Sequence, residues 1–139
     1  MFAVPVRLFG VRLLRGVRVR ELCQIIACDI HPLNNLRVLR YLVHTVGVSE
    51  EVKNEWYLHW VKDGLAALEA HLARDAGTAD FCHGETPTLA DCFLVPQVFN
   101  ATRHGIDVSA YPNIARINEA CAKLPAFAAA HPSNQPDAE

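Results

Sequence analysis

The sequence predicts an all-α domain, built as a bundle of five or six helices. Apolar residues recur at spacings of three and four along most of the chain, which is the period of an amphipathic helix. The alternation typical of strands is absent, and glycine is scarce, with 7 among 139 residues. A chain of this length, with 51% hydrophobic and 20% charged residues, is typical of a single globular domain with a substantial core.

The first helix is expected over residues 16–46. Pro32 removes one helical N–H, so a kink is expected near residues 29–32, with free backbone groups beside His31 and Asn35. Gly47 provides a stop. The apolar face of this helix comprises Val19, Leu22, Cys23, Ile26, Ile30, Leu33, Leu36, Leu39 and Val43.

The second helix is expected to begin after Ser49, a good N-cap that is followed by two glutamates suited to the positive end of the helix dipole. It should end near Asp75, ahead of a turn-rich loop over residues 76–87, in which Phe81 packs back against the core. Its apolar side comprises Val52, Trp56, Trp60, Leu65, Leu68 and Leu72.

The segment Thr88-Leu89-Ala90-Asp91 predicts the start of a third helix through a capping box, in which Thr88 and Asp91 each bind the other's backbone N–H. The nearly continuous apolar run that follows indicates a largely buried central helix, locally kinked at Pro96.

A further helix should start at residues 111–113 and end at Leu124-Pro125, followed by a short turn. The domain organisation expected is an irregular basic segment over residues 1–15, the helical domain over 16–131 and an extended tail over 132–139.

Charge is unevenly distributed along the chain. Residues 1–20 contain five arginines and no acidic residue, which leaves 8 basic and 15 acidic residues, a net charge of −7, in the remainder. An acidic body argues against nucleic-acid binding, which needs basic stripes. The basic start favours a segment that replaces a lost upstream domain, with a targeting peptide as the alternative. No apolar run reaches the length of a membrane span, so no membrane association is expected.

The five cysteines are odd in number and show no C-x-x-C spacing. This pattern favours reduced thiols in a cytoplasmic protein over a secreted disulfide framework. A zinc site formed by Cys82, His83, Cys92 and His104 is conceivable, but the expectation is that no metal is bound.

A polar cluster interrupts the first apolar helical run: Asp29, His31, Asn34, Asn35 and Arg37. Buried polar groups without partners cost about 1–3 kcal/mol each, so a helix built only for packing has no use for so many. Arg37, and Arg103 after the buried helix, can each bind a carboxylate through two hydrogen bonds. The cluster therefore predicts an anion-accepting helical face with no catalytic residue of its own; the alternative is a set of satisfied polar residues at helix ends.

Three motifs carry a resemblance that spans roughly residues 15–137: IIACDIHPLNNLRVL (25–39), TPTLADCFLVPQVFNA (86–101) and AHPSNQPD (130–137). Together they resemble the C-terminal helical domain of zeta-class glutathione transferases, the group that includes maleylacetoacetate isomerases. No counterpart of the thioredoxin-like domain of that family is recognised in the sequence.

The resemblance implies a fold, an activity and a set of site residues. It implies glutathione contacts at His31, Asn35, Leu36 and Arg37, and contacts to the substrate at Arg103 and Asn34. The implied activity is glutathione-dependent cis–trans isomerisation of maleylacetoacetate or a related small diacid in aromatic amino-acid catabolism, by a homodimer. Without the thiol-activating domain, activity of this chain alone is doubtful. The alternative is a non-catalytic helical protein-interaction module on the same fold.

Overall fold

A computed structural model describes residues 6–136 and 138, with side chains from Leu14 onward. Its longer helices are α1 (Val6–Gln24), α4 (Glu50–Arg74), α5 (Leu89–Arg103) and α6 (Pro112–Ala122). Shorter helices are α2 (His31–Asn34), α3 (Leu36–Tyr41) and α7 (Pro125–Ala130), with π-helical segments η1 (Ile25–Ile30) and η2 (Leu42–Val46) and 3₁₀ turns η3 (Val108–Ala110) and η4 (Pro132–Asn134). All secondary structure in this described part is helical, which confirms the predicted class.

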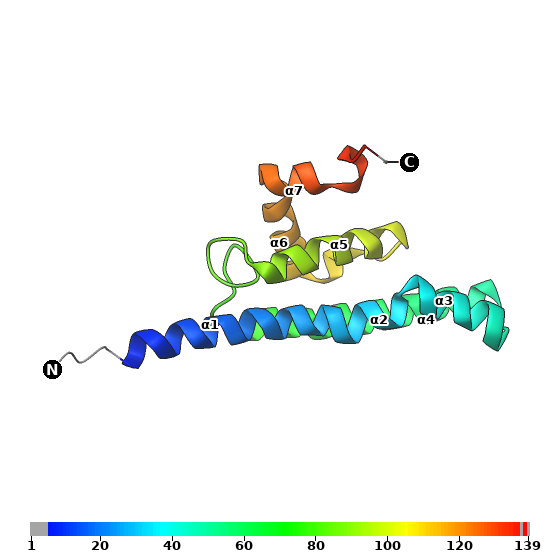
Figure 1. The fold of residues 1–139 in the computed structure, drawn as a ribbon, viewed down its shortest axis with the longest axis horizontal. Coiled ribbons are helices and arrows are strands. Elements are labelled where there is room, and N and C mark those ends of the chain that lie inside the picture. Colours follow the sequence, from blue (N-terminus) through cyan, green and yellow to red (C-terminus); the bar gives the residue numbers. More distant parts are fainter. Residues whose placement is uncertain (1–5, 137, 139) are drawn as a thin grey trace.

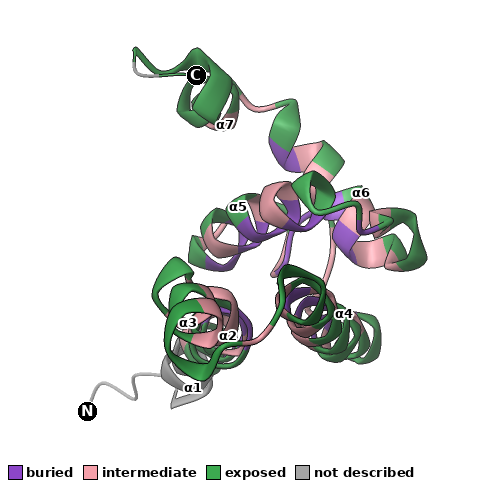
Figure 2. Ribbon diagram, turned by 90° about the vertical axis from the view of Figure 1, so that its right-hand side faces the viewer, coloured by how far each residue is buried: buried purple, intermediate pink, exposed green. Residues whose placement is uncertain are grey.

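The helices form two layers. The segments from α1 to η2 make one long rod, and α4 returns alongside it (Figure 1). Seen end-on, α5 lies above this pair, with α6 beside α5 and α7 farthest away (Figure 2). The core lies where α1, η1, α4, α5 and α6 meet; its largest fully buried apolar side chains include Leu22, Ile30, Val61, Leu65, Leu68, Leu72, Leu94, Ile114 and Ile117. Within the described residues, no helix has the length and apolar character needed to cross a bilayer.

The first helix starts earlier than expected. It begins at Val6, whereas the sequence predicted residues 1–15 to be irregular and the helix to start at Gly16. Leucine and arginine are both good helix formers, and residues 6–15 contain no proline. The arginines interrupt the apolar helical period of this stretch, which explains why the predicted start of the helix is wrong. Residues 1–5 lie outside the described part.

The predicted kink at Pro32 is present but is part of a longer interruption. The chain is π-helical through η1, Pro32 lies in the first turn of α2, and the helix then breaks at Asn35, where ψ is 141°. The Asn35 side chain accepts a hydrogen bond from the N–H of Arg37 at 2.9 Å and so caps α3. The single continuous helix expected over residues 16–46 is therefore wrong: Asn35 divides it.

The α4 helix has the boundaries that its caps predict. Ser49 Oγ accepts a hydrogen bond from the N–H of Val52 at 3.3 Å, and the helix ends at Arg74. Gly64 on α4 lies directly against Ile30, so that a Cβ atom at position 64 would collide with the Ile30 side chain. The α4 helix and the rod can therefore approach closely at this point.

The capping box of α5 is present as predicted. Asp91 is fully buried, and its carboxylate accepts hydrogen bonds from the N–H of Thr88 at 2.6 Å and from the Thr88 hydroxyl at 2.8 Å. It also accepts the N–H of Cys82 at 2.8 Å. Asp91 thus joins the start of α5 to the preceding loop, while Phe81 packs into the core as expected.

The buried side chain of Arg18 on α1 binds the same loop. Arg18 donates hydrogen bonds to the carbonyl of Cys82 and the hydroxyl of Thr78, both at 2.6 Å, and forms an ion pair with Asp75 at 2.5 Å. Its guanidinium also lies 3.1 Å from Nδ1 of His83. Burial, followed by the positive charges of Arg18 and Arg15, lowers the pKa of His83, and Asp75 opposes this only partly.

This arrangement predicts that acid weakens the fold. An unfolded histidine titrates near pH 6.5, so below that pH the unfolded state binds more protons than the folded state, and the free energy of unfolding falls. We expect the free energy of unfolding of His83→Gln, measured by denaturant titration, to fall less than that of the parent between pH 7 and pH 5. His44→Gln, which changes an exposed histidine in η2, is the matched control. Equal pH dependence for His83→Gln and the parent would contradict the assignment.

The C-terminal part is more ordered than the sequence predicted. Glu69 on α4 accepts the backbone N–H groups of Asn113 and Ile114, at 3.1 and 3.0 Å, and so anchors the start of α6. The expected short turn is helix α7. The tail expected to be extended over 132–139 instead folds back through η4, because the side chains of Asn134 and Gln135 donate to the carbonyls of Ala128 and Ala129 at the end of α7. Residues 137 and 139 lie outside the description.

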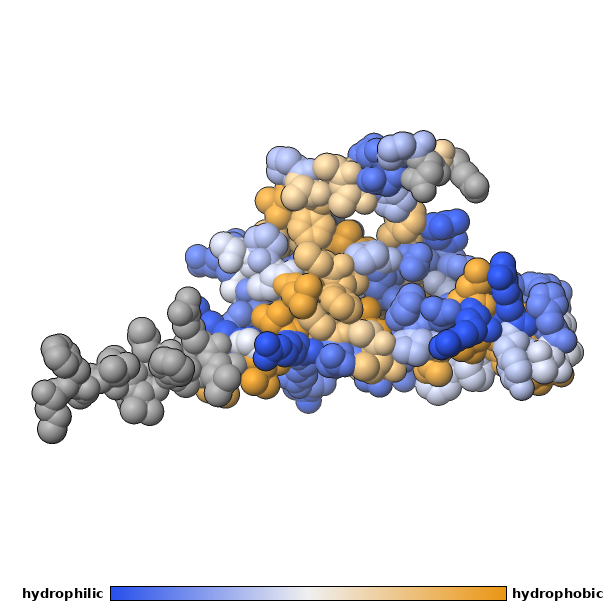
Figure 3. Space-filling model, in the orientation of Figure 1, coloured by the Kyte–Doolittle hydropathy of each residue, from blue (hydrophilic) through white to orange (hydrophobic). Residues whose placement is uncertain are grey.

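An apolar groove of about 340 Å³ separates α7 from α5; it is lined by Cys92, Val95, Pro96, Phe99, Ala126, Phe127, Ala130, His131 and Pro132. Figure 3 shows apolar atoms gathered in a band over α5 and up to α7. This groove is distinct from the polar cleft described next.

Candidate ligand-binding site

A polar cleft of about 340 Å³ lies between the interrupted rod and the C-terminal half of α5, within the size range of small-molecule sites. Its lining comes from α2 and α3, from α4 and from α5 with the residue that follows it: His31, Asn34, Asn35, Leu36, Leu39, Tyr57, Gln97, Asn100 and His104. The break at Asn35 gives the cleft its first wall, because it turns successive polar residues toward α5.

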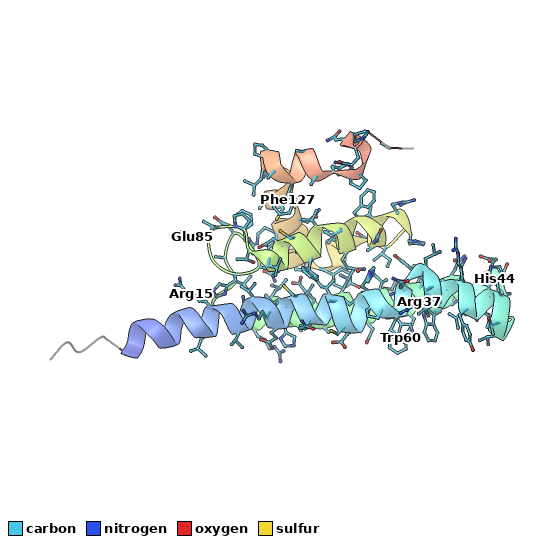
Figure 4. All side chains as sticks on the ribbon, in the orientation of Figure 1. Arg15, Arg37, His44, Trp60, Glu85 and Phe127 are labelled. Atoms are coloured by element: carbon cyan, nitrogen blue, oxygen red, sulfur yellow. The ribbon has the colours of Figure 1, made fainter. Side chains whose placement is uncertain are left out.

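Four of the residues predicted from the sequence meet in this cleft: His31, Asn34, Asn35 and Leu36. Arg37 is exposed and lies outside the lining, although it is adjacent to Leu36 (Figure 4). The role implied for Arg37 therefore rests on the resemblance and on its place next to Leu36 in the chain.

Backbone carbonyls and one indole hold the first wall in place. The Asn34 side chain donates to the carbonyl of Ile30 at 3.3 Å, and Trp56 Nε1 donates to the carbonyl of Leu33 at 2.8 Å. Trp56 packs edge-on against Trp60, with ring centroids 5.7 Å apart, and Figure 4 shows Trp60 on the side of α4 away from α5. Oδ1 of Asn34 is buried and has no hydrogen-bond partner among the described residues. It is an acceptor that a ligand can satisfy.

The roles of the two neighbouring amides differ. Oδ1 of Asn35 is occupied as the cap of α3, whereas its amide nitrogen lies 3.4 Å from Nε2 of His31. Asn35 therefore shapes the wall and keeps one donor in the cleft.

The opposite wall contains residues that the sequence analysis missed: Tyr57, Gln97, Asn100 and His104. Tyr57 and His104 stack with ring centroids 3.8 Å apart. Burial, with smaller contributions from the positive charges of Arg103 and Lys53, lowers the pKa of His104, which favours the neutral form of the imidazole. Gln97 and Asn100 are polar residues in an apolar helix, the same signal that identified His31 and Asn34, and it could have identified them.

Arg103 lies outside this cleft. Its guanidinium lies 5.7 Å from the centroid of the Phe99 ring and borders a second cavity with His131, Ser133 and Gln135 of the C-terminal segment. Its charge nevertheless acts on the cleft, because it lowers the pKa of His104 and opposes the rise that burial causes in the pKa of Tyr57.

The cleft can therefore bind an oxygen anion but has no evident nucleophile. No Asp, Glu, Lys, Arg or Cys belongs to its lining.

Burial raises the pKa of the Cys23, Cys82 and Cys121 thiols, which keeps them protonated and poorly nucleophilic. All five cysteines are unpaired. Across the described part of the chain, no three His, Cys, Asp or Glu residues gather closely enough to hold a metal ion.

Residues 61–132 match the model of the glutathione S-transferase C-terminal domain. The chain is 49% identical over 121 residues to a probable maleylacetoacetate isomerase of Vibrio cholerae, covering 87% of this chain and 55% of that protein. A holo structure of a maleylpyruvate isomerase, described as a bacterial zeta-class glutathione S-transferase, superposes with a TM-score of 0.83 at 48% identity, over 88% of this chain and 57% of the other.

A third comparison concerns a maleylacetoacetate isomerase from Anaeromyxobacter dehalogenans, with glutathione bound in its active site. It superposes with a TM-score of 0.81 at 45% identity, over 88% of this chain and 55% of the other. The chain thus spans about half the length of the relatives it matches. On this evidence the chain belongs to the glutathione S-transferase family, as a zeta-class member represented by its C-terminal helical domain.

Proposed function

We propose that this chain is the helical half of a glutathione-dependent cis–trans isomerase that acts on maleylacetoacetate or a related small diacid. The observation that carries the proposal is the cleft, whose lining includes His31, Asn34, Asn35 and Leu36. A non-catalytic interaction module on the same fold is not favoured, because the relatives are isomerases and the cleft keeps the polar residues such a module would not need.

The residues present suit glutathione as the cofactor. Asn35 offers an amide donor, and His31 offers a ring nitrogen. Glutathione would supply the thiol that adds to the cis double bond and leaves after rotation. In this proposal His31, Asn35, Leu36 and Arg37 bind glutathione, whereas Asn34 and Arg103 bind the diacid.

Arg37 and Arg103 should affect different ligands in a chain completed by the N-terminal half of the Vibrio cholerae relative. Arg103→Ala should raise the KM for the diacid, and Arg37→Ala the KM for glutathione, each about ten- to hundredfold, because each removes a charge-assisted contact. Steady-state kinetics with both ligands varied measures this. Arg40→Ala, on the exposed side of α3, is the control. Equal effects of the two variants on both ligands would show that these arginines are ordinary surface charges.

We also propose that the active form is a cytoplasmic homodimer. A groove between the long rod and α4 is lined by apolar Ile25, Leu33 and Trp60 beside Asp29 and Asp63, and its tryptophan is of the residue type enriched at interfaces. Light scattering coupled to size-exclusion chromatography measures the molar mass in solution and distinguishes a dimer from a monomer.

A further inference from the structure

Gln97 is the one cleft residue that is both strongly polar and almost completely buried. Its exposed fraction is 5%, it lies in the cleft lining, and its side chain forms no hydrogen bond with any described residue. Asn100 follows three residues later on the same face of α5, is half-buried, and likewise lacks a side-chain partner within the described chain. Among the described residues, Oδ1 of Asn34 is the only buried polar side-chain atom without a partner, so the amide groups of Gln97 and Asn100 keep solvent access in the cleft and are free to bind a ligand or water.

The electrostatics around the two amides favour an anion. The titratable groups that share the lining are His31 and His104, which carry no negative charge, and Tyr57, whose pKa burial raises. Arg103 and Lys53 lie close enough to lower the pKa of His104 and therefore place a positive potential on this wall. A carboxamide offers two N–H donors, which suits the oxygens of a carboxylate.

We infer that Gln97 and Asn100 form an amide subsite that receives one carboxylate of a dicarboxylic ligand. The inference rests on the proposed function for the diacid class of the substrate, and it adds two contact residues to those expected from the resemblance. Arg103, outside the lining, keeps the contact to the diacid proposed above, and the two amides bind the carboxylate that lies in the cleft.

Malonate serves as the probe, and the intact chain is titrated with it while amide NMR signals are followed. The side-chain amide signals of Gln97 and Asn100 should shift, and malonamide, the uncharged analogue, should leave them in place. Gln97→Met keeps the side-chain length but removes the donors, and should weaken malonate binding about tenfold or more. Gln24→Met, an exposed glutamine on α1, should bind malonate as the parent does.

The free energy of unfolding of Gln97→Met distinguishes a glutamine that binds a ligand from one that only stabilises the fold. Because the Gln97 amide has no partner, Gln97→Met should unfold at the same or a higher denaturant concentration than the parent. A loss of stability, unchanged malonate affinity, or equal shifts with malonamide would each overturn the inference. The NMR titration of the parent stands even if the variant does not fold.

The two proposals fail in different ways. If the completed chain turns over the diacid and Gln97→Met leaves its KM unchanged, the amide subsite is wrong and the isomerase proposal stands. If malonate binds at Gln97 but the completed chain shows no turnover, the subsite stands and the isomerase proposal is wrong.

Discussion

Asp91→Ala should lower the free energy of unfolding by about 3 kcal/mol or more, because it removes a charged acceptor from a fully buried position. The carboxylate accepts hydrogen bonds from the N–H of Cys82 and from the N–H and hydroxyl of Thr88. The substitution would leave these donors without their acceptor and would separate the start of α5 from the loop before it. Chemical denaturation followed by circular dichroism measures the change.

Two further variants separate the contributions at this site. Thr88→Ala removes one side of the capping box and should cost about 0.5–2 kcal/mol, less than Asp91→Ala. Asp91→Asn keeps the shape of the side chain but replaces one acceptor oxygen by a donor. Its loss of unfolding free energy should therefore lie between those of Thr88→Ala and Asp91→Ala or close to that of Asp91→Ala. If Asp91→Ala and the parent unfold at the same denaturant concentration, the buried carboxylate does not hold the loop to α5.

The chain alone should show no glutathione-dependent isomerisation above the solution rate, and addition of the N-terminal half of the Vibrio cholerae relative should restore it. The thiolate is the reactive form of a thiol, and a free thiol has a pKa near 8.5, so only a few per cent is ionised at pH 7. The lining of the cleft contains amide and imidazole side chains but no lysine or arginine that could stabilise a thiolate. The missing activation should be worth about 10²–10⁴ in rate, the range of a positioned proton-transfer group.

The assay follows the loss of the cis diacid in three samples: chain, added half, and both together. A complemented sample that carries Asp91→Ala tests whether activity follows the folded helical domain. Substantial turnover by the chain alone would mean that it contains its own thiol-activating group and that the proposed need for a second domain is wrong.

The parts of the fold that the sequence predicted correctly depend on local signals. Ser49 and the Thr88–Asp91 box define the starts of α4 and α5, because a cap needs only neighbouring residues. The break at Asn35 was missed because Pro32 was the more conspicuous helix breaker. The anchoring of α6 by Glu69 could not be predicted, since the two residues it holds are more than forty positions away.

Only part of the lining of the candidate cleft can be predicted from the sequence, for a similar reason. His31, Asn34, Asn35 and Leu36 lie in one short segment, and their density marked them as a cluster. Gln97 and His104 reach the same cleft from another helix, so their importance depends on how α5 packs on the rod. Arg103 was expected in the same group, but it turns to the Phe99 ring and the C-terminal segment.

Gly64 on α4 can affect the cleft indirectly, through Ile30. It touches no lining residue, yet Ile30, against which it packs, immediately precedes His31 in the chain. A side chain at position 64 would collide with Ile30, so that Ile30 or α4 would have to shift. Because Ile30 adjoins His31, we expect substitutions of Gly64 to disturb the His31–Asn35 wall from α4 without changing any residue of the lining.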